Sequence, residues 1–276
     1  MMDQARAFLD ECERLLTLVA PLSTEDLRRP TAFKGWTIED VIGHLHIWNW
    51  GADTALQDPA AFEAWLAEVM SALQSGTLRD FERGWLGDLT GPALITAWRD
   101  FFRPMAERFG QADPAHRVKW AGPSMSVRSS ITARLMETWA HGQEIYDELG
   151  LTRTSTDDIQ NIVVLGVKTY GWSFQVHGRA VPEPMPYLVL EAPSGTLWTY
   201  GEESQRERIE GPAEAFCQVV TQTRNIADTT LRVTGPNATA WMEEAQCFAG
   251  PPETPPAPGT RVRRSIPPPG NVKSQA

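Results

Sequence analysis

The chain has 276 residues, of which 42% are hydrophobic and 22% are charged, as in an ordinary globular protein. Its formal net charge of −10 argues against a nucleic-acid-binding surface, which needs a basic patch. No apolar run reaches the roughly 20 residues of a membrane span, and the first residues lack the apolar segment of a signal peptide. We therefore expect a cytoplasmic protein with no nucleic-acid partner and no membrane partner.

The three cysteines, Cys12, Cys217 and Cys247, lie far apart and form no Cys-x-x-Cys pair. This spacing favours free, buried thiols in a reducing compartment over a disulfide.

Helical periodicity divides the first 150 residues into four long helices and their connections. Pro21 ends the first helix, Thr37 and Asp40 form a capping box at the start of the second, and Gly150 ends the fourth. The long helices are expected at 3–20, 37–56, 90–110 and 126–149, with short helices at 22–27 and 58–73 and a loop at 118–125. Four such helices indicate a bundle.

The pattern changes after Gly150. The prolines Pro182, Pro184 and Pro186 are typical of a linker, and Pro193-Ser-Gly195 between two apolar runs predicts a β-hairpin. Helices are expected at 156–176, 211–223 and 236–248, and strands at 187–192, 196–200, 207–210 and 229–234. This order predicts a small α+β unit with an antiparallel or mixed sheet, so the fold class of the whole chain is α+β.

The last stretch, residues 251–276, contains eight prolines and a basic run from Arg261 to Arg264. Such a composition cannot bury much apolar surface, so we expect a tail that is disordered or loosely draped, with interaction through its arginines as a less favoured alternative. The predicted organisation is a helical bundle at 1–152, a helix plus a small α+β domain at 153–250, and the tail at 251–276.

His44 lies two turns inside the second long helix, on the same face as Val41, Leu45 and Trp48. It therefore points into the bundle, either as a core histidine bonded to a neighbour or as a metal ligand. His46 points elsewhere, and we expect it at the surface.

Glu137 and His141 are four residues apart on the fourth long helix, so they share one face. A carboxylate and an imidazole in this arrangement suit a borderline divalent metal, although such a pair is also common on solvated helices. With His44 they make three potential ligands inside a bundle, which leaves one coordination position open.

These residues carry a family resemblance. Residues 35–40 (Gly-Trp-Thr-Ile-Glu-Asp) followed by His44, and Glu137 followed by residues 139–145 (Trp-Ala-His-Gly-Gln-Glu-Ile), resemble the DinB-like superfamily. The likeness is greater to the branch that includes mycothiol-dependent maleylpyruvate isomerase. Residues 120–125, 192–198 and 245–250 resemble a subfamily described only as metal-binding.

The resemblance implies a DinB-like four-helix bundle that binds a divalent metal through His44, Glu137 and His141. We expect zinc from the resemblance, although two histidines and one carboxylate also suit nickel, manganese or ferrous iron. It also implies a sterol-carrier-like C-terminal domain that covers the metal site. Arg224 is a candidate substrate contact by its position in that domain.

Four further residues are candidate substrate-binding residues. Trp120 and Met125 lie in the expected loop and could line a pocket or plug the end of the bundle. Trp48 follows His44 by one turn, and Arg134 precedes Glu137 by one turn. Arg134 could orient Glu137 or bind an anionic substrate, but an ordinary surface arginine is the simpler interpretation.

Three functions remain open. The resemblance favours a metal-dependent transferase or isomerase that uses a low-molecular-weight thiol such as mycothiol on a small electrophilic substrate. A metal-assisted hydrolase or hydratase is the second possibility, with Glu144 as the nearest candidate base. The third is a non-enzymatic protein that binds a metal or small molecule. We expect a monomer or a homodimer in each case, and the sequence assigns no catalytic residue.

Overall fold

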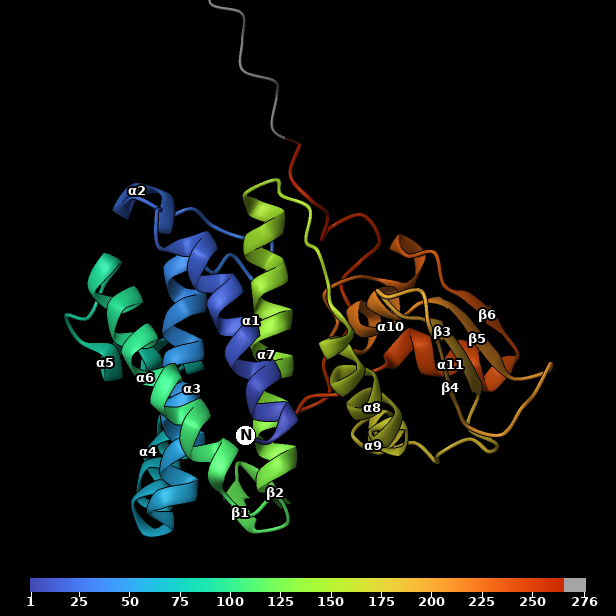
Figure 1. Cartoon of the computed structure of the whole chain (residues 1–276), viewed down its shortest axis with the longest axis horizontal. Coiled ribbons are helices and arrows are strands. Elements are labelled where there is room, and N and C mark those ends of the chain that lie inside the picture. Colours follow the sequence, from blue (N-terminus) through green and yellow to red (C-terminus); the bar gives the residue numbers. More distant parts are fainter. Residues whose placement is uncertain (266–276) are drawn as a thin grey trace, which may run out of the picture.

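The structure is a computed structural model that describes residues 1–265. Four long helices pack as a bundle in which each contacts two of the others (Figure 1). They are α1 (Asp3–Val19), α3 (Ile38–Gln57), α6 (Gly91–Gln111) and α7 (Val127–Glu148). The four-helix bundle expected from the sequence is confirmed.

The ends of the helices that carry His44 and Glu137 are set by local sequence. Thr37 caps α3 in a capping box, in which its hydroxyl accepts from the Asp40 backbone N–H. The Ser126 hydroxyl caps α7 by accepting from the Ser129 backbone N–H. Gly150, just past the end of α7, has a left-handed φ of +68°, which confirms the helix end predicted from this glycine.

Two connections differ from the sequence prediction. Residues 118–125 are not an irregular loop but most of an antiparallel hairpin, in which Val118 pairs with Met125. The sequence analysis did not predict the helix over Leu78–Leu86, because nine residues are too few to show a clear helical periodicity of apolar residues. The elements between the long helices are α2 (Thr24–Leu27), α4 (Pro59–Ser75), α5 (Leu78–Leu86), β1 (Arg117–Trp120) and β2 (Gly122–Ser126).

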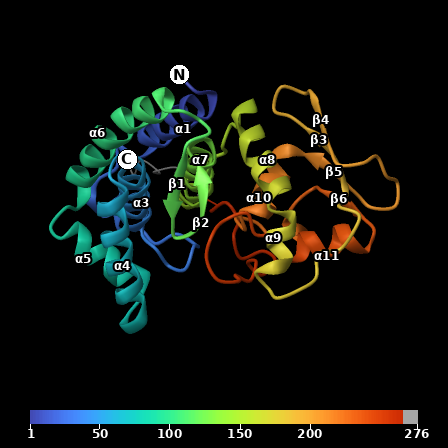
Figure 2. The ribbon, with the colours of Figure 1, turned by 90° about the horizontal axis from the view of Figure 1, so that it is seen from below.

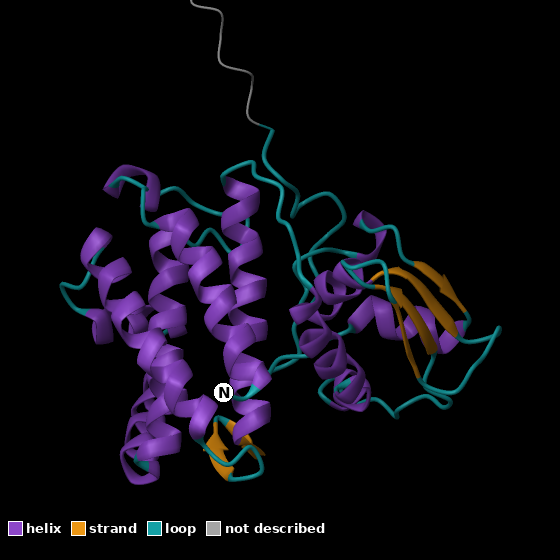
Figure 3. Cartoon of the chain, viewed as in Figure 1, coloured by secondary structure: helices purple, strands orange, loops and turns teal. Residues whose placement is uncertain are grey.

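The C-terminal unit is a small α+β unit, in which helices accompany a four-stranded mixed sheet with the strand order β4-β3-β5-β6 (Figure 3). β3 and β5 are parallel, and the other two pairs are antiparallel, including the predicted hairpin of β3 and β4. The likeness of this unit to a sterol-carrier fold stays a prediction. Its elements are η1 (Asp157–Ile159), α8 (Gln160–Lys168), α9 (Tyr170–Gln175), β3 (Tyr187–Glu191), β4 (Leu197–Tyr200), β5 (Arg208–Pro212), α10 (Ala213–Val220), η2 (Ile226–Asp228), β6 (Arg232–Thr234) and α11 (Pro236–Glu244).

The helix expected over 156–176 is broken at Thr169. The Thr169 hydroxyl donates to the carbonyl oxygens of Leu165 and Gly166, at 2.8 and 3.0 Å. A threonine side chain that bonds backward in this way competes with the helical ladder. The chain therefore turns between α8 and α9 instead of continuing straight.

Helix α7 belongs to both hydrophobic cores. Its Ile131 and Leu135 are buried with the bundle, whereas Met136, Trp139 and Ala140 are buried with the C-terminal unit. Figures 1 and 2 show α7 between the other bundle helices and α8. The C-terminal unit is therefore packed directly on the helix that carries Glu137 and His141.

Of the two alternatives for the tail, the disordered one is wrong for residues 251–265, which we call the C-terminal segment and which lie along α7 and the C-terminal unit. Polar groups hold it in place: Asn225 donates to the Pro256 carbonyl oxygen at 2.8 Å, and the Arg264 backbone N–H donates to the Asp147 carbonyl oxygen at 2.8 Å. Hydrogen bonds, and not the burial of apolar side chains, keep this segment ordered. Its composition offers few apolar side chains to bury. The rest of the predicted tail, 266–276, lies outside the described residues.

Among the described residues, no helix is both long and apolar enough to cross a membrane. Cys12, Cys217 and Cys247 are all buried and free, as the sequence predicted.

We predict that Thr37→Ala lowers the free energy of unfolding by about 1 kcal/mol, because the capping box at the start of α3 is lost. Denaturant unfolding measures the change. Thr17→Ala, at an exposed position of α1, is the control and should change stability by less than about 0.5 kcal/mol. Equal losses in both variants would contradict a specific role of the cap.

Candidate metal centre

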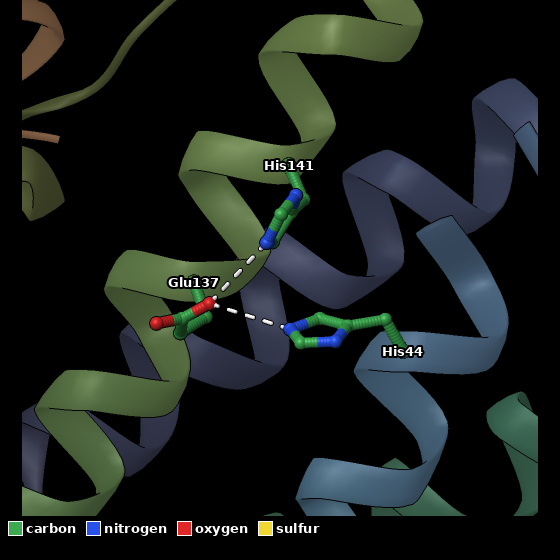
Figure 4. A group of neighbouring side chains, drawn as sticks. All are labelled: His44, Glu137 and His141. Atoms are coloured by element: carbon green, nitrogen blue, oxygen red, sulfur yellow. Dashed lines mark ion pairs between the residues drawn. The ribbon is translucent and has the colours of Figure 1, made fainter. Parts of the chain in front are cut away.

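Three side chains from two bundle helices point toward one another in the interior of the bundle. His44 comes from α3, and Glu137 and His141 come from α7 (Figure 4). Glu137 Oε2 lies 3.6 Å from His44 Nε2 and 3.4 Å from His141 Nε2. One ligand atom from each of the three residues lies within 4.8 Å of the other two.

A fourth residue orients His44. The His44 Nδ1 lies 2.6 Å from Glu82 Oε1, so that Nε2 is the nitrogen that faces Glu137. Glu82 is fully buried and also accepts a hydrogen bond from Trp48 Nε1 at 3.0 Å. The Arg79 guanidinium pairs with its other oxygen. A carboxylate behind a histidine in this way fixes the tautomer and the orientation of the ring.

Sequence reasoning missed Glu82 because it missed α5. A local signal was present, since Thr77 and Asp80 form a capping box at the start of that helix. Sequence periodicity does not show which helices pack together, so the contact between α5 and α3 was not predicted.

Glu137 is held as a carboxylate. Burial acts to raise its pKa, but hydrogen bonds with His141 and His44 outweigh burial and hold the pKa well below its ordinary value. For His44, burial acts to lower the pKa, but Glu82 and Glu137 outweigh it and raise the pKa. For His141 burial dominates and lowers the pKa. The group therefore combines one anionic oxygen donor with two imidazoles of unequal basicity.

Aromatic rings enclose His141. The Trp36 ring is stacked on the imidazole with centroids 5.9 Å apart, and Phe33 meets it edge-on at 5.1 Å. These contacts fix the ring and leave the Glu137 carboxylate, whose side chain is 22% exposed, as the most accessible of the three groups.

His46 is not at the surface as the sequence suggested. It is 7% exposed and lies between Phe101 of α6 and Trp85 of α5. Burial lowers its pKa to about 4. The unrecognised helix α5 explains the error, because it covers a face of α3 that was taken as solvated.

A cavity of about 150 Å³ lies beside Glu137 and His141. Helix α7 forms one wall, and the loop with Phe33 and Lys34 forms another. The remaining walls come from the C-terminal unit and from the C-terminal segment. Those lining residues are Thr221, Gln222, Thr223, Phe248, Glu253, Thr254, Pro256 and Arg261. The C-terminal unit therefore covers the side of α7 that carries two of the three potential ligands.

Glu144 also lines this cavity, about one helical turn beyond His141 in the sequence. It is 2% exposed, and its Oε1 accepts a hydrogen bond from Arg261 Nη1 at 3.2 Å. Burial raises the pKa of Glu144 to about 7, against the opposing effect of Arg261. The cavity therefore contains a carboxyl group that can hold or release a proton near neutral pH.

None of the four predicted substrate-binding residues lines the cavity. Trp48 and Trp120 pack against each other, with ring centroids 5.6 Å apart, near the hairpin, and Met125 lies in that hairpin. Arg134 is 3% exposed and donates to Asn49 Oδ1 at 3.1 Å, so the surface interpretation of this residue is wrong. Trp120 and Met125 belong to the hairpin, whereas the charge of Arg134 acts on Glu137 and helps to lower the pKa of that carboxyl.

Arg224, the other candidate substrate contact, pairs with Asp147 at 2.7 Å instead. It ties the C-terminal unit to the last turn of α7 and is not among the residues that line the cavity.

The donor set fits a divalent ion of borderline softness. Two imidazole nitrogens and one carboxylate oxygen are the ligands that zinc and its neighbours accept. The carboxylate is ionised, and Glu82 bonds to the ring nitrogen of His44 that faces away from Glu137, as carboxylates behind metal-bound histidines do. Three donors leave a coordination position for a further ligand.

Comparisons with known proteins identify a family for the chain. Residues 8–146 match the family described as "Mycothiol maleylpyruvate isomerase N-terminal domain". Two uncharacterised proteins from strains of Mycobacterium tuberculosis are 38% identical over 243 residues, which is 88% of this chain and 93% of each relative.

Two solved structures are similar in fold. One is a mycothiol-dependent maleylpyruvate isomerase variant with one histidine replaced by alanine, with a TM-score of 0.50 and 16% identity. The other, of the same isomerase, has a TM-score of 0.49. Each alignment covers 78% of this chain and 85% of the other. The first supports the α+β architecture.

Glu144 predicts a specific pH dependence of stability. Its pKa is raised in the folded chain from 4.5 to about 7, so its stabilising effect is full below pH 4.5 and is lost as the pH rises through 7. Glu144→Gln should remove this loss, which amounts to at most about 3 kcal/mol. Denaturant unfolding of both proteins between pH 4.5 and 8 measures it. Glu107→Gln, an exposed carboxyl, is the control, and parallel curves for wild type and Glu144→Gln would contradict the prediction.

Proposed function

Because the chain belongs to the family of mycothiol maleylpyruvate isomerase N-terminal domains, we propose that it is a metal-dependent enzyme that uses a low-molecular-weight thiol. His44, Glu137 and His141 hold the divalent metal, zinc, and the substrate is a small electrophile. The reaction class is an isomerisation or a thiol transfer. The observation that carries the proposal is the convergence of three metal-ligand side chains within 4.8 Å beside a cavity.

The chain's own residues account for the holding of the ion. Glu137 supplies the anionic oxygen, and each histidine supplies a ring nitrogen that already faces that oxygen. Glu82 keeps His44 in the required tautomer. A divalent ion held here would lower the pKa of a thiol in its open position, so that the thiol reacts as a thiolate at neutral pH.

The reactive thiol has to come from outside the chain. Cys12, Cys217 and Cys247 are buried, and burial raises the pKa of each thiol. None of them lines the cavity. A free low-molecular-weight thiol, mycothiol by the names of the relatives, supplies this group in the proposal.

The cavity provides the place for the electrophile. Phe33, Met136 and Phe248 give it apolar walls, which limit the access of water to a reactive intermediate. Arg261 supplies a cation to its lining, and Glu144 beside it can hold or release a proton.

Glu144 also favours a second candidate function, a metal-assisted hydrolase or hydratase, since a carboxyl with a pKa of about 7 suits a general base toward water. In that case metal binding persists but no thiol binds. A non-enzymatic binding protein would show neither thiol binding nor turnover.

The test is elemental analysis of the purified wild type and of a His44→Ala, Glu137→Ala, His141→Ala triple variant, with calorimetric titration by mycothiol, glutathione and bacillithiol. We expect about one metal ion per chain in the wild type, none in the variant, and binding of one thiol only to the metal-loaded protein. Metal binding without thiol binding would favour the water-based reaction, and the absence of metal would refute the proposal.

Glu82→Gln should weaken metal binding by about 10- to 100-fold, because the variant loses the carboxylate that orients His44. Competition with a chromophoric chelator measures the affinity. Glu107→Gln, which is exposed and far from α5 in the sequence, is the matched control and should bind the metal as the wild type does. Wild-type affinity in Glu82→Gln would show that the hydrogen bond to His44 has no role at the site.

A further inference from the structure

The C-terminal segment, residues 251–265, lies across the cavity beside the candidate metal centre. Glu253, Thr254, Pro256 and Arg261 of this segment line the cavity, together with Glu137 and His141 of α7. Much of the cavity wall opposite the bundle is thus made by a stretch that follows the last helix of the fold.

Polar contacts hold this segment, and it buries little apolar surface. Lys34 pairs with Glu253 at 3.0 Å, Gln222 donates to the Glu253 carbonyl oxygen at 3.2 Å, and the Gly259 backbone N–H donates to Asp228 at 2.9 Å. Val262, an apolar side chain of the segment, is 52% exposed. Segments with few buried apolar contacts open locally at low free-energy cost.

Arg261 makes the contacts that join the segment to three separate parts of the protein. Its guanidinium donates to the Gln222 carbonyl oxygen of the C-terminal unit at 2.6 Å and to Glu144 of α7 at 3.2 Å. It also lies over the Phe33 ring, 4.7 Å from the centroid. Only 13% of the side chain is exposed, so these contacts are shielded from solvent.

The cavity, which is partly open to solvent, is smaller than the ligands that the proposed function requires. A cavity of about 150 Å³ is of the size that holds a single benzene-sized molecule. A thiol of the mycothiol class and a second substrate together exceed this volume. Because α7 contributes to the hydrophobic core of the bundle and to that of the C-terminal unit, moving those two walls would break apolar packing, and the C-terminal segment is the wall that can move at least cost.

We propose that the C-terminal segment is a gate over the cavity beside Glu137 and His141. Arg261 is its latch, the residue whose contacts hold the gate closed. The gate opens to admit a thiol-bearing ligand larger than the cavity. The need for such a ligand rests on the proposed function. The latch itself rests only on the contacts of Arg261.

The first test measures how fast metal leaves the full-length protein. Zinc-loaded wild type and Arg261→Ala are mixed with excess chelator, and zinc loss is followed in time. Arg261→Ala should lose zinc about tenfold faster, because hydrogen bonds from a charged group no longer hold the gate. Its equilibrium affinity for zinc should stay within about twofold of wild type, since Arg261 is not a ligand.

Arg179→Ala is the matched control. Arg179 also pairs with a carboxylate, Glu244, and lies over an aromatic ring, Phe174, but it lies on the C-terminal unit away from the cavity. This variant should lose zinc at the wild-type rate. Arg261→Lys keeps the charge without the forked donor and should fall between the wild type and Arg261→Ala. Thermal melting checks that each variant is folded.

Limited trypsin digestion gives a second readout that needs no metal. Arg263 and Arg264 are exposed, but the Arg264 backbone N–H is held by the Asp147 carbonyl oxygen, and trypsin needs a backbone that is free to enter its active site. Cleavage after Arg263 and Arg264 should therefore be about tenfold faster in Arg261→Ala than in the wild type or Arg179→Ala, because opening releases the backbone of the segment. Unchanged cleavage would overturn the gate. If the wild type binds no zinc, the proposed function fails, and the digestion alone decides whether Arg261 latches the segment.

Discussion

The burial of α7 on two sides is the constraint on which the rest of the structure depends. One side of this helix completes the core of the bundle, and the other completes the core of the C-terminal unit. Glu137 and His141 lie on the helix between these cores, so their positions are set by packing and not by a flexible loop. His44 meets them because α3 packs on α7 inside the bundle.

The burial of His44, Glu137 and His141 costs free energy, because these groups lose their hydration. Hydrogen bonds and ion pairs between the buried groups offset this cost. Glu137 lies between two imidazoles, and Glu82 lies between His44, Trp48 and Arg79. Buried charges without such partners would shift to their neutral forms. The chain of contacts from Arg79 through Glu82 and His44 to Glu137 therefore keeps a carboxylate ionised at the position where a cation is expected.

The sequence predicted those parts of the fold that depend on local signals. Thr37 and Asp40 mark the start of α3, Gly150 follows the end of α7, and Pro193-Ser-Gly195 marks a hairpin, and the structure has all three. The family resemblance added the convergence of His44, Glu137 and His141, which spacing alone could not give for residues so far apart in the chain.

The errors fall where tertiary packing decides. The helix α5 is short, and its loss from the prediction hid Glu82 and left His46 apparently at the surface. Arg134 was taken as exposed because a charged residue is rarely buried, yet it bonds to Asn49 inside the bundle. Arg261 was assigned to a disordered or loosely draped tail, because composition does not identify a partner such as Glu144 or the Gln222 carbonyl oxygen.

The proposed centre joins these features. The packing of α3 and α7 positions the three potential ligands. The contacts among Glu82, His44 and Glu137 keep Glu137 ionised. The cavity gives a small molecule access to Glu137 and His141. The central claim is that a thiol can reach a metal ion held by these three residues.

The most direct measurement is the electronic absorption spectrum of the cobalt(II)-substituted protein during titration with mycothiol. Cobalt(II) takes the same nitrogen and oxygen ligands as zinc and is coloured. We predict that a sulfur-to-cobalt charge-transfer band appears and saturates at one thiol per chain, and that it is absent from the His44→Ala, Glu137→Ala, His141→Ala variant. A d–d spectrum that does not respond to the thiol would contradict the account.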